Sequence, residues 1–392
     1  MIIVVFCIIA LLFTLADVYI VVSVLHHTSW FAKVWLFIPP LAYWALILWM
    51  FITGDTRQMT LNSVMWFTIG LVLPTLVFTL LSIIGKELGR AWHPFYPIFT
   101  GIGICVAVAW LFIFIFGSVF GWRRLEVKNM DITLSNLPEN FNGYRIVQLS
   151  DLHIGLYEIV PDALSRIVKR VNSLNPDLIV FTGDLVNISP EEVVPFAEML
   201  SQLNATDGVI SILGNHDYCV YKKYREGENP DSALAIVIEA EDSIGWNLLR
   251  NESVQIVRGN DSIAVVGIDY TGGKDFPDKS DLRKAMEKIP ENECTILLCH
   301  DPSYWRKEVL LTTEIPLMLA GHTHGMQFQM GNFSPASWIY PEWNGIYAEK
   351  DRYLNVNTGV GGNFAFRFGV YPTIDVLTLH SPESSVPNET NS

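Results

Sequence analysis

The chain has 392 residues, which is long enough for more than one folding unit. Half of its residues are hydrophobic and its mean hydropathy is +0.31, which is too apolar for an ordinary soluble enzyme of this length. Its formal net charge of −14 argues against a nucleic-acid polymer as a partner, because an acidic surface repels polyanions.

The excess of apolar residues lies at the front of the chain, in four stretches separated by short polar links. These stretches cover residues 2–25, 34–53, 63–84 and 98–120. Each is close to the roughly 20 residues that span a bilayer. No positively charged segment precedes the first stretch and no A-x-A cleavage site ends it, which indicates a retained helix. We therefore expect a four-helix transmembrane anchor over residues 1–121, with Asp17 facing the bundle or lying near an interface, and assign it no transport role.

The basic residues around the four stretches indicate which side of the membrane carries the rest of the chain. Four spans place the amino terminus and the following domain on the same side. The flanks on that side hold Arg57, Arg123, Arg124 and Lys128, whereas the opposite links hold Lys33, Lys86 and Arg90. This excess of four over three predicts a multi-pass protein of the cell membrane with a cytoplasmic domain.

From residue 122 to about residue 380 the chain alternates strand-like and helix-like segments. Strands are predicted at 144–150, 177–182, 208–213, 262–268, 295–299, 315–320, 352–357 and 373–379. Helices are predicted at 161–174, 191–203, 231–244 and 279–289. This order is typical of an α/β domain whose sheet is covered by helices on its outer faces. The polar tail 381–392 is expected to be disordered.

Five of the predicted strands end in polar side chains that can ligate a metal. In chain order these are Asp151 and His153, Asp184 and Asn187, Asn215 with His216 and Asp217, His300, and His322 with His324. One D-x-H pair alone also fits an Asx turn with a surface histidine. Residues i and i+2 of an extended chain share a side, so Asp151 and His153 are expected to converge. Because ligands bind at the carboxyl ends of strands in open α/β sheets, the five motifs together predict one metal-containing site.

This ordered set resembles the calcineurin-like metallophosphoesterase family, whose blocks are D-x-H, G-D, G-N-H-D, a lone His and G-H-x-H. The resemblance covers about residues 144–380 and extends to the membrane-associated YaeI/YkuE-like branch, which includes UDP-2,3-diacylglucosamine hydrolases. "GNHDY", "GHTHG" and "NTGVGG…RFG…TIDVLTL" fit that branch, although Met326 stands where it often has a glycine. The resemblance implies a calcineurin-like four-layer αββα sandwich, with two packed mixed sheets flanked by helices, over residues 122–380.

The resemblance also implies a role for each motif residue. Asp151, His153 and His324 would hold one metal ion, Asn215, His300 and His322 would hold a second, and Asp184 would bridge the two. Mixed His, Asp and Asn ligands suit two ions of Mn, Fe or Zn better than Mg or Ca. Two such ions would provide hydroxide near neutral pH. His216 would act as the general acid for the leaving oxygen, with Asp217 orienting its ring.

Three further features bear on the substrate. The segment 218–225 mixes tyrosines with basic residues and fits either a clamp for a diphosphate or nucleotide, or a solvated loop. The aromatic segment 326–343 fits packing on its own core, or a lip for acyl chains or the membrane interface. Arg367 matches a branch position and fits a contact with substrate phosphate as well as a surface salt bridge.

These observations predict a membrane-anchored, metal-dependent phosphohydrolase of the phosphodiesterase or pyrophosphatase type. Its expected partners are the lipid bilayer and a lipid-linked or nucleotide phosphoester, with UDP-2,3-diacylglucosamine as the substrate that the branch suggests. No obligate protein partner is inferred. The alternative is a transporter or membrane sensor whose phosphoesterase-like domain only regulates or binds. The nearly complete lack of polar residues in the four apolar stretches argues against that alternative.

Overall fold

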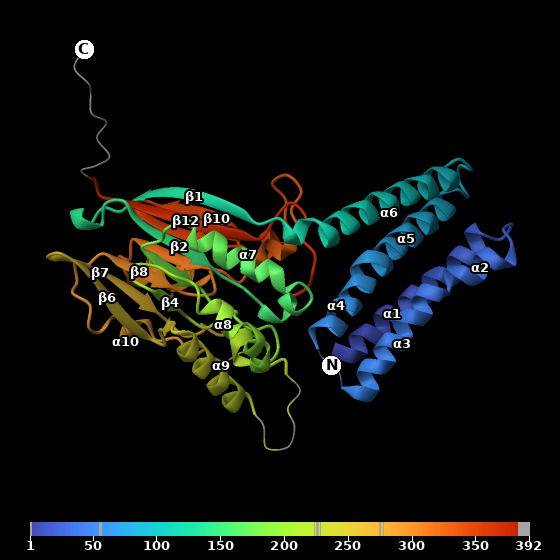
Figure 1. The fold of residues 1–392 in the computed structure, drawn as a ribbon. Coiled ribbons are helices and arrows are strands. Elements are labelled where there is room, and N and C mark those ends of the chain that lie inside the picture. Colours follow the sequence, from blue (N-terminus) through green and yellow to red (C-terminus); the bar gives the residue numbers. More distant parts are fainter. Residues whose placement is uncertain are drawn as a thin grey trace, which may run out of the picture. The chain divides into compact units, whose positions relative to one another are not determined.

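A computed structural model describes residues 2–54, 57–222, 224, 227, 229–273, 276 and 278–382. The chain forms two compact units (Figure 1). One comprises residues 1–120 together with Phe364–Phe366, and the other comprises Gly121–Asn363 and the chain from Arg367 onward. Most of the tail 381–392 that is predicted to be disordered lies outside the described residues, as do Lys223 and Arg225 of the segment 218–225. Ser381, at the start of that tail, is instead buried, and its hydroxyl donates to the Glu139 carboxylate.

The first unit is helical. Its elements are α1 (Ile2–Tyr19), η1 (Ile20–Val24), α2 (Trp30–Leu36), α3 (Ile38–Thr53), α4 (Gln58–Phe67), η2 (Thr68–Val72), α5 (Leu73–Leu88) and α6 (Phe95–Val119). They make four helical segments that are long and apolar enough to cross a membrane, Val4–Val24, Trp30–Thr53, Gln58–Leu88 and Phe95–Arg123.

Side chains of this helical unit are apolar on the outside as well as the inside. Phe13, Tyr43 and Val64 are buried in its core, whereas Ile52 and Phe112 are 72% and 78% exposed. An apolar exterior is expected where helices face lipid. Asp17 is buried in the unit, in agreement with the expectation that it faces the bundle.

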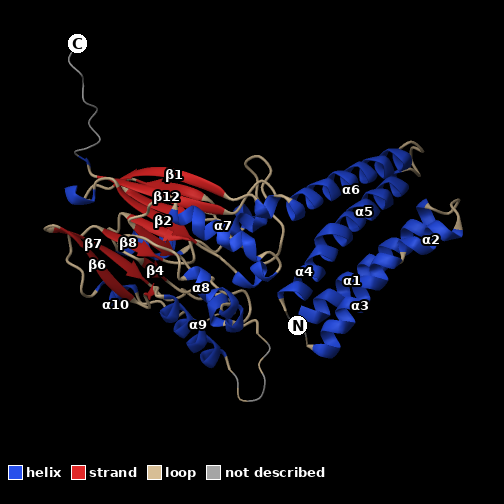
Figure 2. Ribbon diagram, in the orientation of Figure 1, coloured by secondary structure: helices blue, strands red, loops and turns tan. Residues whose placement is uncertain are grey.

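The second unit contains two six-stranded mixed sheets (Figure 2). Sheet A has the order β1-β12-β2-β3-β4-β5, and sheet B has the order β10-β11-β9-β8-β7-β6. The strands of sheet A are β1 (Glu126–Thr133), β12 (Thr373–His380), β2 (Tyr144–Leu149), β3 (Leu178–Phe181), β4 (Val209–Ser211) and β5 (Asn247–Leu248). Those of sheet B are β10 (Gly345–Glu349), β11 (Arg352–Val356), β9 (Leu317–Ala320), β8 (Thr295–Leu298), β7 (Asp261–Gly267) and β6 (Glu252–Arg258).

The two sheets pack face to face with helices on both outer sides, which confirms the predicted four-layer αββα sandwich. Ile146 of β2 lies in the core between the sheets, and its neighbour Val147 packs in the core beneath the helices of sheet A. This alternation follows from the two-residue period of a strand. The helices on sheet A are α7 (Pro161–Asn172), α8 (Ala197–Leu200) and α9 (Pro230–Ile244), and those on sheet B are α10 (Leu282–Met286), η9 (Trp305–Val309) and α11 (Leu310–Thr312).

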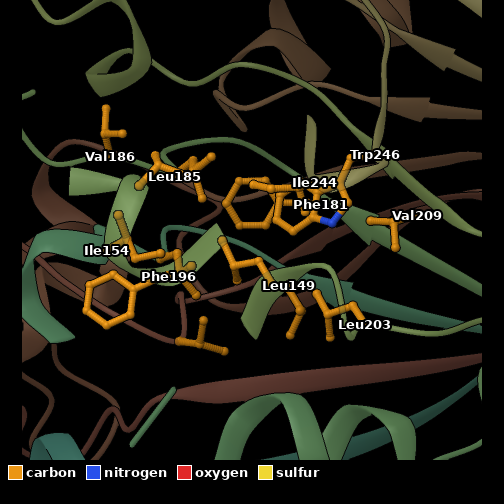
Figure 3. Close-up of a cluster of buried hydrophobic side chains, with 14 of the residues drawn as sticks. Leu149, Ile154, Phe181, Leu185, Val186, Phe196, Leu203, Val209, Ile244 and Trp246 are labelled. Atoms are coloured by element: carbon orange, nitrogen blue, oxygen red, sulfur yellow. The ribbon is translucent and has the colours of Figure 1, made fainter. Parts of the chain in front are cut away.

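The core beneath the sheet A helices positions the strand ends that form the site. Leu149 and Phe181, at the ends of β2 and β3, pack there with Leu185 and Trp246 (Figure 3). All four side chains are at most 5% exposed. Because the last residue of each strand is fixed in this core, the loops that follow start from defined positions.

The predicted helix at 191–203 is wrong in its extent. The segment instead forms two short 3₁₀ turns, η6 (Pro190–Glu192) and η7 (Val194–Phe196), before the single turn of α8. Pro195 lacks the backbone N–H that a continuous helix needs, which explains the break. The helix predicted at 279–289 is likewise shorter, as α10.

Candidate metal centre

The predicted ligands come from the carboxyl ends of strands in both sheets. In sheet A, the loops after the parallel strands β2, β3 and β4 carry Asp151, Asp184 and Asn215. In sheet B, the loops after the parallel strands β8 and β9 carry His300 and His322. The site is therefore built at the common end of two packed sheets. The strand ends alone predict one open sheet, whereas the resemblance implies two packed sheets.

Most of these ligand residues have left-handed backbone conformations. The φ angles are 51° for Asp151, 43° for His153, 60° for Asp184, 75° for His322 and 50° for His324. Such angles cost energy in residues other than glycine, and they cluster at functional sites. The expectation that Asp151 and His153 project from one side of an extended chain is therefore wrong, because both residues lie in a tight turn after β2 has ended.

The first ligand cluster consists of Asp151, His153, Asp184 and His324, which are all buried. The Nε2 atoms of His153 and His324 lie 3.0 Å apart. His324 Nε2 lies 3.2 Å from Asp151 Oδ1, and His153 Nε2 lies 3.7 Å from Asp184 Oδ2. Four donor atoms thus converge on one point.

The second cluster consists of Asp184, His300 and His322. His300 Nε2 lies 3.2 Å from Asp184 Oδ2, and Asn215 has a buried Oδ1 without a hydrogen-bond partner among the described residues. Asp184 belongs to both clusters, so its carboxylate is the shared group. The structure brings together the two sets of ligands that the sequence predicted, although Asn215 joins the second set only by its position after β4.

The hydrogen bonds of these side chains leave lone pairs directed at the centre. Nδ1 of His300 lies 2.7 Å from the Thr182 carbonyl oxygen and must donate its proton there. In the neutral ring, Nε2 therefore directs a lone pair at the Asp184 carboxylate, and two such acceptors need either a proton or a metal cation between them. Burial opposes the charged form of His300, but Asp184 outweighs this and raises the pKa of its imidazole to about 10.

The carboxylates of the centre are kept ionised despite complete burial. Burial alone favours their neutral forms, but the imidazoles of His324 and His300 lower the pKa of Asp151, and His300 and His216 lower that of Asp184. Buried anionic oxygens together with unpartnered imidazole and amide atoms form a donor set that fits transition-metal ions. The residues present therefore fit a pair of metal ions that share Asp184.

His216 lies beside the first cluster, with its ring 4.6 Å from that of His153 between centroids. Its Nδ1 lies 2.5 Å from the carbonyl oxygen of Asn187, so Nδ1 donates to that carbonyl and Nε2 remains for proton exchange. The ring is only partly buried, as a group that meets substrate must be. The orienting partner of His216 is thus a backbone carbonyl.

Asp217 does not orient the His216 ring as the sequence argument expected. Its Oδ1 accepts hydrogen bonds from the backbone N–H groups of Leu185 and Val186, and its Oδ2 accepts from those of Asp184 and Gly214. The carboxylate therefore ties the loop after β3 to the loop after β4. Its physical role is to hold Asp184 and Asn215 in place.

Two further residues touch the ligands. The Tyr340 hydroxyl lies 2.9 Å from Nε2 of His322. The aromatic segment 326–343 contains Tyr340, but nothing in the sequence indicated a contact with a ligand. Arg367 is fully buried, which excludes the surface salt bridge. Its Nη2 donates to the carbonyls of Thr358 and Gly361 and lies 3.4 Å from His324 Nδ1. Contact of Arg367 with a substrate phosphate stays a prediction.

Comparison with known proteins decides the family. Residues 144–326 match the model of the calcineurin-like phosphoesterases. The chain is 30% identical over 289 residues to the uncharacterized metallophosphoesterase YkuE of Bacillus subtilis, covering 68% of this chain and 91% of that protein. The chain belongs to the calcineurin-like phosphoesterase family. Members of this family bind two metal ions and hydrolyse phosphoesters, in agreement with the cluster described above.

Two other relatives of this phosphoesterase have informative names. The transmembrane protein with metallophosphoesterase domain of Danio rerio is 30% identical over 330 residues, covering 80% of this chain and 72% of that protein. The UDP-2,3-diacylglucosamine pyrophosphatase LpxG of Chlamydia muridarum is 26% identical over 310 residues, covering 66% of this chain and 90% of that protein. Membrane-associated members of the family are thus among its relatives.

Proposed function

We propose that this phosphoesterase is a membrane-anchored enzyme that hydrolyses a phosphodiester or pyrophosphate bond of a lipid-linked substrate. The observation that carries the proposal is the pair of buried ligand clusters joined by Asp184, with His216 beside them, in a chain that also has four apolar helices of spanning length. Relatives named as transmembrane proteins and as a nucleotide-lipid pyrophosphatase support the same class of substrate.

The residues divide the chemistry between them. Asp151, His153 and His324 would hold one ion of Mn, Fe or Zn, Asn215, His300 and His322 would hold the other, and Asp184 would serve both. When bound, such a pair neutralises phosphate oxygens and lowers the pKa of the attacking water. His216, held through Nδ1 by the Asn187 carbonyl, would give a proton from Nε2 to the leaving oxygen as the P–O bond breaks. Arg367 would contribute positive charge beside His324.

The bond to be tested first is the pyrophosphate of UDP-2,3-diacylglucosamine, whose hydrolysis releases UMP and a lipid monophosphate. The likeness to LpxG supports this choice. Four spans keep the site close to a bilayer, which raises the effective concentration of a lipid over that of a soluble substrate. The positive-inside bias of the flanking residues supports a multi-pass protein with the phosphoesterase domain in the cytoplasm.

The experiment is to supply full-length protein and Mn with UDP-2,3-diacylglucosamine and with other lipid phosphoesters in mixed micelles, and to measure each product. Release of UMP is the expected result. Turnover of a different lipid without UMP release would discard the nucleotide-lipid substrate and leave the phosphoesterase assignment intact. Hydrolysis of soluble diesters alone would discard the lipid specificity.

A further inference from the structure

The segment from Gly325 to Pro341, called here the apolar loop, follows the last metal ligand and contains no charged residue. Five of its large apolar side chains are exposed: Met326 (40%), Met330 (61%), Phe333 (41%), Trp338 (76%) and Ile339 (62%). A group of exposed apolar side chains of this kind marks a surface that meets another apolar phase.

The apolar loop holds these side chains in fixed positions. Met330 and Phe333 pair through their backbones, and the Ser334 hydroxyl donates to the Gly325 carbonyl at 2.7 Å. The rings of Phe333 and Trp338 are in contact, with centroids 5.4 Å apart. Exposure of the loop therefore results from a defined fold of the segment.

The apolar loop also adjoins the metal centre. Gly325 directly follows the ligand His324, and Tyr340 near the other end of the loop is hydrogen-bonded to the ligand His322. A molecule whose apolar part rests on this loop would therefore have its polar part close to the clusters. Such an arrangement matches a lipid with a phosphoester at its head.

We propose that the apolar loop rests in the interfacial layer of the bilayer and receives the acyl part of the substrate, an inference that builds on the lipid substrate proposed above. The four apolar helices keep the domain at a membrane surface. Tryptophan is favoured at the membrane–water interface. The tip formed by Gly331 and Asn332 is exposed and carries the polar amide side chain of Asn332. Burial of such a group in hydrocarbon is unfavourable, so contact is confined to the headgroup and upper acyl region.

Site-directed labelling tests this contact without depending on turnover. The full chain, with Cys7 and Cys105 replaced by alanine, would carry an environment-sensitive fluorophore on Trp338→Cys in phosphatidylcholine and phosphatidylglycerol vesicles. The other three cysteines are buried. The matched control is Leu311→Cys, because Leu311 is 75% exposed and Trp338 is 76% exposed.

We expect a nitroxide on the lipid acyl chains to quench the label at position 338 and aqueous iodide to quench the label at position 311. Iodide quenching at 338 equal to that at 311 would overturn the proposal, since the loop would then face water. Protection of 338 from both quenchers would also overturn it, because another protein segment would then cover the loop.

An activity comparison provides a second readout. The double variant Trp338→Ser, Ile339→Ser should lose about tenfold or more in kcat/KM on a lipid phosphoester in vesicles, since burying one large apolar side chain changes a partition constant by roughly that factor. Its hydrolysis of bis(p-nitrophenyl) phosphate should stay within about twofold of wild type. Equal losses on both substrates would contradict a lipid-specific role. If the wild type hydrolyses only soluble diesters, the lipid substrate is wrong, and the labelling result alone decides the membrane contact.

Discussion

The exchange Asp217→Asn tests how the metal centre is held together. The carboxylate accepts four backbone hydrogen bonds of 2.8–3.1 Å, two on each oxygen. Asparagine keeps one oxygen and places an NH₂ group against the other two N–H groups. Burial, with a smaller effect of Asp184, raises the pKa of Asp217 to about 7, so the carboxyl is a charged acceptor above that pH. There the exchange loses two bonds, each worth about 1.5–3 kcal/mol, and the cost is about 3–6 kcal/mol. That is a large fraction of the about 5–15 kcal/mol that stabilises a typical domain.

We therefore expect Asp217→Asn to lower the melting temperature, to lose bound metal because Asp184 is released, and to lose activity with it. The assay combines metal content per chain, thermal unfolding and hydrolysis of bis(p-nitrophenyl) phosphate. Asp242→Asn, an exposed position on α9, controls for the loss of one charge. Full metal content and an unchanged melting temperature with a reduced kcat would refute this reasoning and restore Asp217 as the group that orients His216.

Three further outcomes follow from the structure. The His216→Ala variant should keep its bound metal ions, while kcat falls by roughly 10²–10⁴. An equal fall in kcat on substrates with very good leaving groups would exclude His216 as the general acid. Gly214→Ala should lose metal, because a Cβ there collides with Asp184 Oδ1; normal metal content would contradict this. Burial, with a smaller effect of Asp217, raises the pKa of Glu241 from 4.5 to about 8. The folded state therefore keeps a proton that the unfolded state releases above pH 4.5, and the free energy of unfolding falls as the pH rises from 4.5 through 8. Glu241→Gln should thus gain melting temperature over wild type at pH 9 but not at pH 4, unlike the exposed Glu239→Gln on the same helix; parallel pH profiles would contradict this.

The buried strands and the order of the ligands could be predicted because they depend on local pattern. Strands β3, β8 and β9 are short and almost wholly apolar, β2 alternates in part, and polar residues follow each strand within three positions. The amphipathic pattern predicts helix α9 within one residue of its observed start, where Asn229 and Ser232 form a capping box. These features are determined by a few consecutive residues.

Edge strands were harder to recognise. β1, β6 and β10 escaped prediction because each lies partly in solvent and mixes apolar residues with charged ones. These three strands form because they pair with neighbouring strands, and their own sequences show no clear strand pattern. β1, for example, pairs in parallel with β12, which lies more than 200 residues later in the chain.

Contacts between distant loops could not be derived from the sequence. The pairing of His216 with the Asn187 carbonyl, the burial of Arg367 and the contact of Tyr340 with His322 all depend on how loops cross after the strands end. The left-handed turns at Asp151 and His153 have only a weak local signal, since Asp and His adopt this conformation more often than most residues but far less often than glycine. The metal-binding chemistry of the site could be predicted from the types of its residues, whereas the orientations of their side chains could not.

The central claim is that two metal ions sharing Asp184 catalyse phosphoester hydrolysis. Stripped protein should be reloaded with increasing Mn while hydrolysis of bis(p-nitrophenyl) phosphate is followed, for the wild type and for Asp184→Asn. We predict that wild-type activity rises to a plateau at about two equivalents of Mn per chain and that Asp184→Asn stays inactive throughout. Wild-type activity that survives metal removal, or full activity of Asp184→Asn, would contradict the claim.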